Sequence, residues 1–231
     1  MNKLLKLAFS FTILLFAFQT YAQTGNFEGT VEYSMDIDMK NMPPEAAAMM
    51  KSSSMVTKIK NEHSRTETKT PMSSTISITN NKEHTGFTLL DMMGTKYMIK
   101  TKPEEIKKDQ ARPDVKIKEL AETKTIAGYK CKKAEITVAD PETKREYTTT
   151  VFYTADIPYD KGYGNNFKGL KGFPLEYSIS PDAGTQMKFT AVSVTKEKLD
   201  DTIFAVPTGY KETTTEDLQK EMMKNFGGGG Q

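Results

Sequence analysis

The feature that most constrains this chain is a regular alternation of apolar and polar residues between positions 27 and 39. Val31, Tyr33, Met35 and Ile37 are separated by glutamate, serine and aspartate. Successive side chains of a β-strand point to opposite faces, so a period of two predicts a long strand with one buried face. A helix would need apolar residues three and four positions apart.

The same period of two returns along most of the remaining chain and is broken by short turn sequences. Ala127-Gly128 and Asp182-Ala183-Gly184 have the composition of tight hairpin turns. The further strands expected from this pattern cover Val56–Ile59, Arg65–Lys69, Thr75–Thr79, Gly86–Leu90, Lys96–Ile99, Lys124–Ile126, Tyr129–Val138, Arg145–Tyr153, Leu175–Ile179 and Met187–Val194. Many strands joined by turns predict a mainly β protein.

Helical signals are few. A short helix is expected over Pro44–Lys51, with proline in its first turn, and a second over Glu216–Asn225, where Thr213 and Glu216 have the spacing of a capping box. A long antiparallel sheet must cover its apolar face or curl on itself. We therefore expect a single antiparallel, strongly curved sheet with one or two short helices covering its concave face.

Residues 1–22 have the pattern of a secretory signal peptide. Lys3 and Lys6 precede an apolar run at positions 7–18, which is shorter than the ~20 residues that span a bilayer. The small residue Ala22 marks the expected cleavage site. The mature protein is then periplasmic or secreted and has no stable membrane anchor, because no later segment is apolar enough to serve as one.

The mature chain is expected to form one β-rich domain over residues 23–226, followed by a disordered glycine-rich tail at 227–231. The whole chain has 32 basic and 30 acidic residues, and the excess, Lys3 and Lys6, lies in the expected signal peptide. A mature chain without net charge argues against nucleic-acid binding, which depends on a basic excess.

No residue pattern indicates catalysis. His63 and His84 have no metal-ligand or nucleophile partner at a recognisable spacing, and the single cysteine, Cys131, is more typical of a small buried hydrophobe than of a reactive thiol. We expect no enzyme activity, no cofactor and no His- or Cys-based metal site.

Methionines gather beside the first strand. Six of them fall within 21 residues of sequence, namely Met35, Met39, Met42, Met49, Met50 and Met55. Three interpretations stay open: fillers of an irregular core, a mobile flap over residues 41–55 that lines an adaptable apolar pocket, or soft-metal capture in which Met39 and Met42 bind Cu(I).

Several longer stretches carry a family resemblance. Residues 64–72, 90–97 and 124–134 together resemble the family of exported domains of unknown function numbered 4412. Residues 152–177 are similar to the related family named after its GLPGLI motif, although Lys171 and Phe173 depart from that motif. The resemblance implies a LolA-like lipoprotein-carrier fold, which is a half-barrel with a helical lid over an apolar cavity.

The leading hypothesis is a non-enzymatic binding protein that shelters an apolar or lipid-like ligand in the half-barrel. The alternatives are a cell-envelope interaction or structural module with a filled core and no ligand, and, third, copper binding by methionine. The residues expected to line the ligand cavity are Val31, Tyr33, Met35, Ile37, Met49, Met50, Phe87, Leu89, Met98, Phe152 and Phe189.

Overall fold

The computed structural model describes residues 27–40, 42–71, 73–92, 94–105, 115–139, 146–157, 167, 169–182 and 184–226. The expected signal peptide and the expected glycine-rich tail lie outside these residues. Among the described helices, none is both long enough and apolar enough to cross a membrane.

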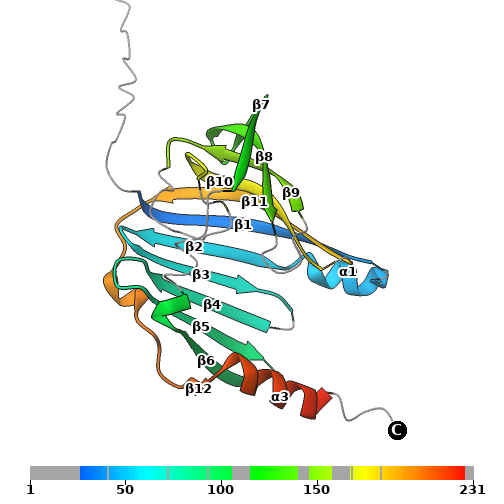
Figure 1. The fold of residues 1–231 in the computed structure, drawn as a ribbon, viewed down its shortest axis with the longest axis vertical. Coiled ribbons are helices and arrows are strands. Elements are labelled where there is room, and N and C mark those ends of the chain that lie inside the picture. The colour runs from blue at the N-terminus through cyan, green and yellow to red at the C-terminus, as the bar shows by residue number, and fades with distance from the viewer. Residues whose placement is uncertain are drawn as a thin grey trace, which may run out of the picture.

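Strands make up most of the described chain and join into one sheet (Figure 1). The strands are β1 (Glu28–Met39), β2 (Ser54–Lys60), β3 (His63–Lys69), β4 (Ser73–Asn80), β5 (Thr85–Met92), β6 (Thr95–Thr101), β7 (Lys116–Ile126), β8 (Tyr129–Ala139), β9 (Glu146–Thr154), β10 (Phe173–Asp182), β11 (Thr185–Lys196) and β12 (Lys211–Thr213). The helical segments are α1 (Pro44–Met50), the 3-10 turn η2 (Asp201–Phe204) and α3 (Thr215–Phe226), and residues 103–105 are also helical. The prediction of a mainly β chain is therefore confirmed.

The sheet is open, with strand order β12-β6-β5-β4-β3-β2-β1-β11-β10-β9-β8-β7. Its central strands β1 and β11 come from the two ends of the chain. β7 also contacts β11, four places away in the order, which shows that the sheet bends at this end. Figure 1 shows β7 and β8 rising steeply away from the plane of β1–β6.

The expectation of a purely antiparallel sheet is wrong at one edge. β12 runs parallel to β6, with Lys211 opposite Tyr97 and Thr213 opposite Ile99, whereas the other pairs of neighbouring strands are antiparallel. The reason is the path of residues 197–210, called the strap here. The strap does not turn back as a hairpin but carries the chain from β11 in the middle of the sheet to its β6 edge.

Cross-strand pairing divides the side chains between two faces of the sheet. Face A carries Val31 and Met35 of β1, and it carries Phe189 of β11, which lies opposite Met35. Face B carries the alternate residues, among them Glu32 and Ser34. Most of the larger apolar core lies on face A of β1, β2 and β8–β11. The burial of one face is what the alternating sequence predicts.

A second, smaller apolar core lies on face B and holds the strap. Phe204 packs there with Ile78 and Leu89. The strap is also tied by polar contacts, because Lys60 Nζ donates to the carbonyl oxygen of Leu199 at 2.6 Å and Arg65 Nη1 donates to that of Ile203 at 3.1 Å. These contacts fix the direction in which the chain enters β12.

Both predicted helices form, but neither lies over the centre of the sheet. α1 has no buried residue, and Figure 1 shows it beyond the ends of β1 and β2. α3 lies along the β6 edge, where Tyr97 Oη donates to Glu221 Oε1 at 2.7 Å and Leu218 is buried. In the described part of the chain, the expectation that helices cover the concave face is therefore not met.

The cap of α3 also differs from the prediction by one residue. The Thr214 hydroxyl accepts a hydrogen bond from the backbone N–H of Asp217 at 3.1 Å and donates to the Asp217 carboxylate at 3.0 Å. The capping pair is thus Thr214 and Asp217, not Thr213 and Glu216. Three threonines and two acids follow one another here, so spacing alone fits either pair.

Candidate functional site

The centre of face A is filled by the protein's own side chains. Tyr177 stacks on Phe189 with ring centroids 4.8 Å apart, and Phe167 meets Tyr177 edge-on at 5.0 Å. Phe167 comes from the connection between β9 and β10, which also supplies the buried Ile157 and Leu170 to this core. A ligand on face A would therefore lie beside this centre and not within it.

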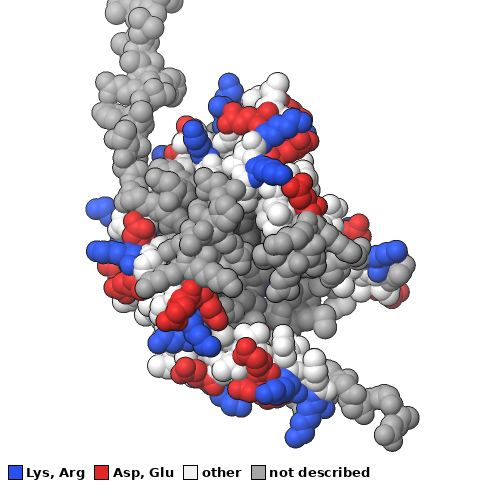
Figure 2. Space-filling view, in the orientation of Figure 1, with Lys and Arg blue, Asp and Glu red and all other residues white. Residues whose placement is uncertain are grey.

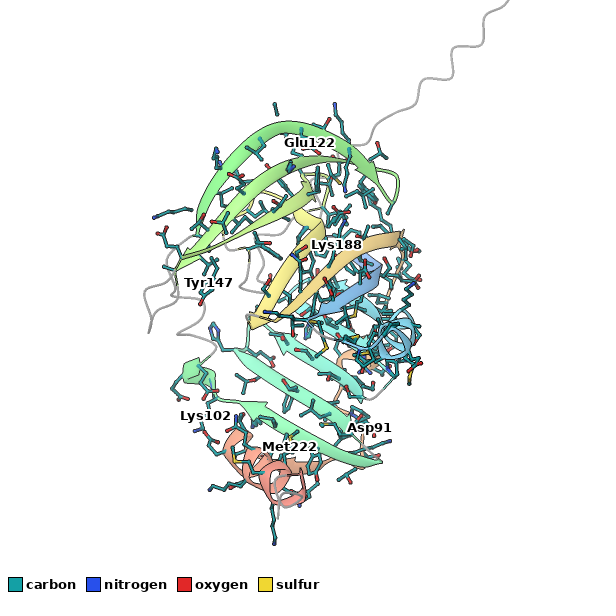
Figure 3. The ribbon with its side chains drawn as sticks, turned by 90° about the vertical axis from the view of Figure 1, so that its right-hand side faces the viewer. Asp91, Lys102, Glu122, Tyr147, Lys188 and Met222 are labelled. Atoms are coloured by element: carbon teal, nitrogen blue, oxygen red, sulfur yellow. The ribbon has the colours of Figure 1, made fainter. Side chains whose placement is uncertain are left out.

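Apolar residues become more exposed toward one end of the same face. At the end of the strands where β1 finishes and β9 begins, an apolar rim follows the buried centre. The rim consists of Ile37, Met39, Val138, Tyr147, Ile179 and Met187. Tyr147 is 54% exposed and Met39 is 41% exposed. Figure 3 looks toward this end of the strands and shows Tyr147 near the start of β9.

Strand register explains why the rim is uncharged and which of its members are direct neighbours. Met187 lies opposite both Ile37 and Ile179, and Val138 lies opposite Tyr147. The charged neighbours, such as Asp38 and Lys188, fall on face B because their positions alternate with those of the rim. Contiguous exposed apolar residues are typical of a binding surface, whereas single ones are not.

The residues predicted to line one cavity lie on both faces of the sheet. Val31, Tyr33, Met35, Phe152 and Phe189 are buried in the larger core, and Ile37 is partly buried beside them. Phe87, Leu89 and Met98 belong to the second core, under the strap on face B. Met49 is 62% exposed on α1, and Met50 is partly buried. This set does not line a single surface.

Sequence reasoning missed most of the rim. Of its members, only Ile37 was among the predicted lining residues. Val138 and Tyr147 are paired across two strands that were both predicted, so the signal was present in the alternation. The register of that pair of strands, which places the two side chains opposite each other, was not predicted.

The chemistry-bearing residues have structural surroundings. Cys131 is buried, and burial raises the pKa of its thiol, which keeps it protonated and unreactive. His63 Nε2 lies 3.1 Å from Asn80 Nδ2, and its ring packs against Phe204 at 5.4 Å. Among the described residues, no group of His, Cys, Asp and Glu side chains is arranged to hold a metal ion.

A charged cluster on face B ties the bent end of the sheet together. Lys124 Nζ donates to Glu176 Oε1 at 2.6 Å and lies 4.1 Å from the centre of the Phe152 ring. Burial alone would raise the pKa of Glu176, but the hydrogen bond and charge of Lys124, with help from Lys188 and Thr190, hold that pKa below its usual value. Each of these charges has a partner, so the cluster is a structural link and not an open site.

A hydrogen bond between Tyr153 of β9 and Glu119 of β7 makes the stability of the fold depend on pH. Its hydroxyl donates to Glu119 Oε1 at 2.8 Å, and burial, together with the hydrogen bond and charge of Glu119, raises the pKa of Tyr153 to about 12. The folded state therefore holds the phenol proton more tightly than the unfolded chain, where the pKa is about 10. The resulting stabilisation is complete below about pH 10 and is lost as the pH rises through about 12.

We expect Tyr153→Phe to remove this dependence. The free energy of unfolding of the unchanged protein should exceed that of Tyr153→Phe near neutral pH, and the difference should shrink between about pH 10 and about pH 12. Urea unfolding at several pH values measures both curves. Parallel curves across that range would contradict the role assigned to Tyr153.

Two solved structures are similar to this chain. One, described as PNGF-II in a C2 space group, has 16% sequence identity and a TM-score of 0.49, over 85% of this chain and 33% of that chain. This chain thus spans about a third of that protein's length. The other is the LolA superfamily protein NE2245 from Nitrosomonas europaea, with 14% identity and a TM-score of 0.35, over 78% of this chain and 91% of that chain. No family model and no curated protein matches the chain.

These likenesses are too distant to assign a function. A LolA superfamily protein is among the similar structures, as the sequence resemblance implies, but the score is low. The resemblance to the exported family numbered 4412 stays a prediction, because no family model matches. What the protein binds has to be argued from its own surface. On the face shown in Figure 2, charges of both signs are interspersed over the described residues.

Proposed function

We propose that this protein is an exported, non-enzymatic binding protein that shelters an apolar, lipid-like ligand on face A. The observation that carries the proposal is the uncharged apolar rim, which continues the buried core to the end of the sheet. In this proposal the ligand's apolar chain lies along the rim on face A. Burial of an acyl chain there gains about 0.8 kcal/mol for each methylene removed from water.

Export is part of the proposal and rests on the signal-peptide pattern of residues 1–22, with cleavage after Ala22. The absence of enzyme activity rests on the surroundings of the chemistry-bearing residues. Cys131 is a buried, protonated thiol, and His63 packs beside Asn80 and Phe204. Among the described residues, Cys131 and His63 are not arranged as a nucleophile with its general base.

An interaction module without a ligand is the second candidate. The filled centre of face A favours it, since Phe167, Leu170 and Ile157 occupy the place that an open carrier would leave to its cargo. In that case the rim is a protein contact, and no small amphiphile binds there with useful affinity.

The two candidates differ in how rim variants affect a lipid probe. We expect a fluorescently labelled dodecanoic acid to bind the purified protein, and Tyr147→Asp or Met39→Asp to weaken binding by about tenfold or more, because the ligand chain would have to desolvate a carboxylate. Both positions are exposed, so the variants should fold. Fluorescence titration measures the affinity.

Val192→Asp is the matched control, because Val192 is a 60% exposed apolar residue of β11 outside the rim. Its affinity for the probe should equal that of the unchanged protein. If the probe fails to bind, or if all three variants behave alike, the rim is not a lipid site and the interaction module is favoured.

A further inference from the structure

A second part of face A carries hydroxyl groups in place of apolar ones. On β3 the residues of this face are Ser64, Thr66 and Thr68, and on β4 they are Ser73, Thr75, Ser77 and Thr79. Cross-strand pairing joins them into rows: Ser64 opposite Thr79, Thr66 opposite Ser77, and Thr68 opposite Thr75. We call these three pairs the hydroxyl rows.

The middle row extends across four strands. Thr57 of β2 lies opposite Thr66, and Thr88 of β5 lies opposite Ser77. Thr57 and Thr66 share one hydrogen bond of 3.1 Å between their hydroxyls. Within the described residues, the hydroxyls of Thr68, Thr75, Ser77, Thr79 and Thr88 make no hydrogen bond to the rest of the chain.

No charged residue of β2–β5 lies on this face. The lysines, arginine and acids of these strands, such as Lys58, Arg65, Glu67 and Asp91, alternate onto face B. An anionic headgroup placed on the hydroxyl rows would find no cation on these strands to neutralise it. A neutral polar group, in contrast, would find donors and acceptors without a charge penalty.

A buried hydroxyl without a partner marks the junction of the two surfaces. Ser53 is only 4% exposed, and its Oγ has no hydrogen-bond partner in the described chain. It directly precedes β2 and continues the alternation of Met55 on face A. Buried polar atoms are nearly always paired, so an unpaired one is a place where a polar atom from outside the chain, of a water or of a ligand, can complete the pairing.

Strand direction brings the rim, Ser53 and one hydroxyl row to the same end of the sheet. Ser34 lies opposite Ser54, and Ser54 lies opposite Lys69, so the start of β2 and the end of β3 are near the end of β1. The Thr68–Thr75 row is therefore the row closest to the rim. It lies two and three strands from β1, at about 5 Å for each strand, and it is level with Tyr33, four residues from Ile37 at about 3.3 Å for each residue. An amphiphile must therefore cover both the distance across the strands and the distance along β1 to reach both surfaces.

We propose, on the basis of the function proposed above, that the ligand is an amphiphile with an uncharged, hydroxyl- or ester-rich head, of the acylglycerol or glycolipid type. The apolar chain lies on the rim, and the head accepts and donates hydrogen bonds at Ser53 and at the Thr68–Thr75 row. Selection between ligands with the same chain then depends on the hydroxyl rows.

Two ligands with one chain length test this inference: 1-monolauroylglycerol, which is neutral, and laurate, which is anionic. Titration calorimetry with the purified full chain should show tighter binding of the monoglyceride by about tenfold or more, because its neutral head both donates to and accepts from the hydroxyl groups and carries no charge to desolvate. The double variant Thr68→Val/Thr75→Val should lose most of that preference and should bind laurate as before.

Thr85→Val is the matched control, since Thr85 alternates with Phe87 and Leu89 on face B of the neighbouring strand β5. It should keep the full preference. Equal or tighter binding of laurate, or a preference that survives the double valine variant, would overturn the neutral-head inference and leave the lipid-binding proposal in place. If neither ligand binds, or if Met39→Asp leaves both affinities unchanged, the proposed function itself fails and the inference fails with it.

Discussion

Gly172→Ala is expected to destabilise the protein by about 3 kcal/mol or more, one of the largest effects of any single substitution in the described chain. Gly172 has φ +152°, and a Cβ built there overlaps the carbonyl oxygen of Thr154 and the ring of Tyr153. The clash is with backbone that is fixed by the pairing of Phe173 with Thr154, so it cannot be relieved by a side-chain rotation. Urea unfolding at neutral pH measures the loss.

Gly209→Ala separates the clash from backbone strain. Gly209 also has a positive φ, +89°, but nothing lies within 4 Å of a Cβ built there. Its substitution should cost only the strain of the left-handed conformation, about 1 to 2 kcal/mol. If the two alanine variants lose the same stability, the close approach of Gly172 to β9 is not what requires glycine at that position.

Local structure followed from local sequence in this protein. The hairpin at Ala127-Gly128 was expected from its residues, and both adopt positive φ values, 47° and 83°, as a tight hairpin between Ile126 and Tyr129 requires. Most strands could be predicted for a similar reason, because the alternation of apolar and polar residues is a property of a single segment. β12, with only three residues, is too short to show a period of two.

Strand order and the sharing of faces did not follow from the sequence. Alternation tells which residues of one strand share a face, but it does not tell which faces of two strands meet. Phe87 and Leu89 alternate as clearly as Val31 and Tyr33, yet they pack on the opposite side of the sheet under Phe204. The strap creates this second core, and its sequence has no periodic pattern that would have predicted it.

The candidate site could not be predicted from single segments either, because it depends on how the strands pair. The rim depends on the pairing of Met187 with Ile37 and Ile179, and the hydroxyl rows depend on the register between β3 and β4. The serines and threonines at alternate positions of two segments indicate no role by themselves. Their significance comes from the sheet, which places them on the same face as the apolar rim.

The centre of face A provides the last test, because it decides how much of that face is open to a ligand. Tyr177 lies between three aromatic neighbours, with Phe189 at 4.8 Å, Phe167 at 5.0 Å and Tyr33 at 6.1 Å between ring centroids. Tyr177→Ala should therefore cost about 3 to 5 kcal/mol, from lost burial, lost ring contacts and the cavity left behind.

Tyr177→Phe keeps the ring and is the control, with an expected loss below about 1 kcal/mol. Urea unfolding gives both free energies, and near-ultraviolet circular dichroism reports whether the remaining aromatic residues stay ordered. A large loss for Tyr177→Ala alone fits a centre that the protein fills itself, which confines any ligand to the rim and the hydroxyl rows. A loss below about 1 kcal/mol for alanine would mean that Phe167 and its neighbours are loosely packed. The centre of face A would then itself be available to the ligand's apolar chain, as in an open carrier.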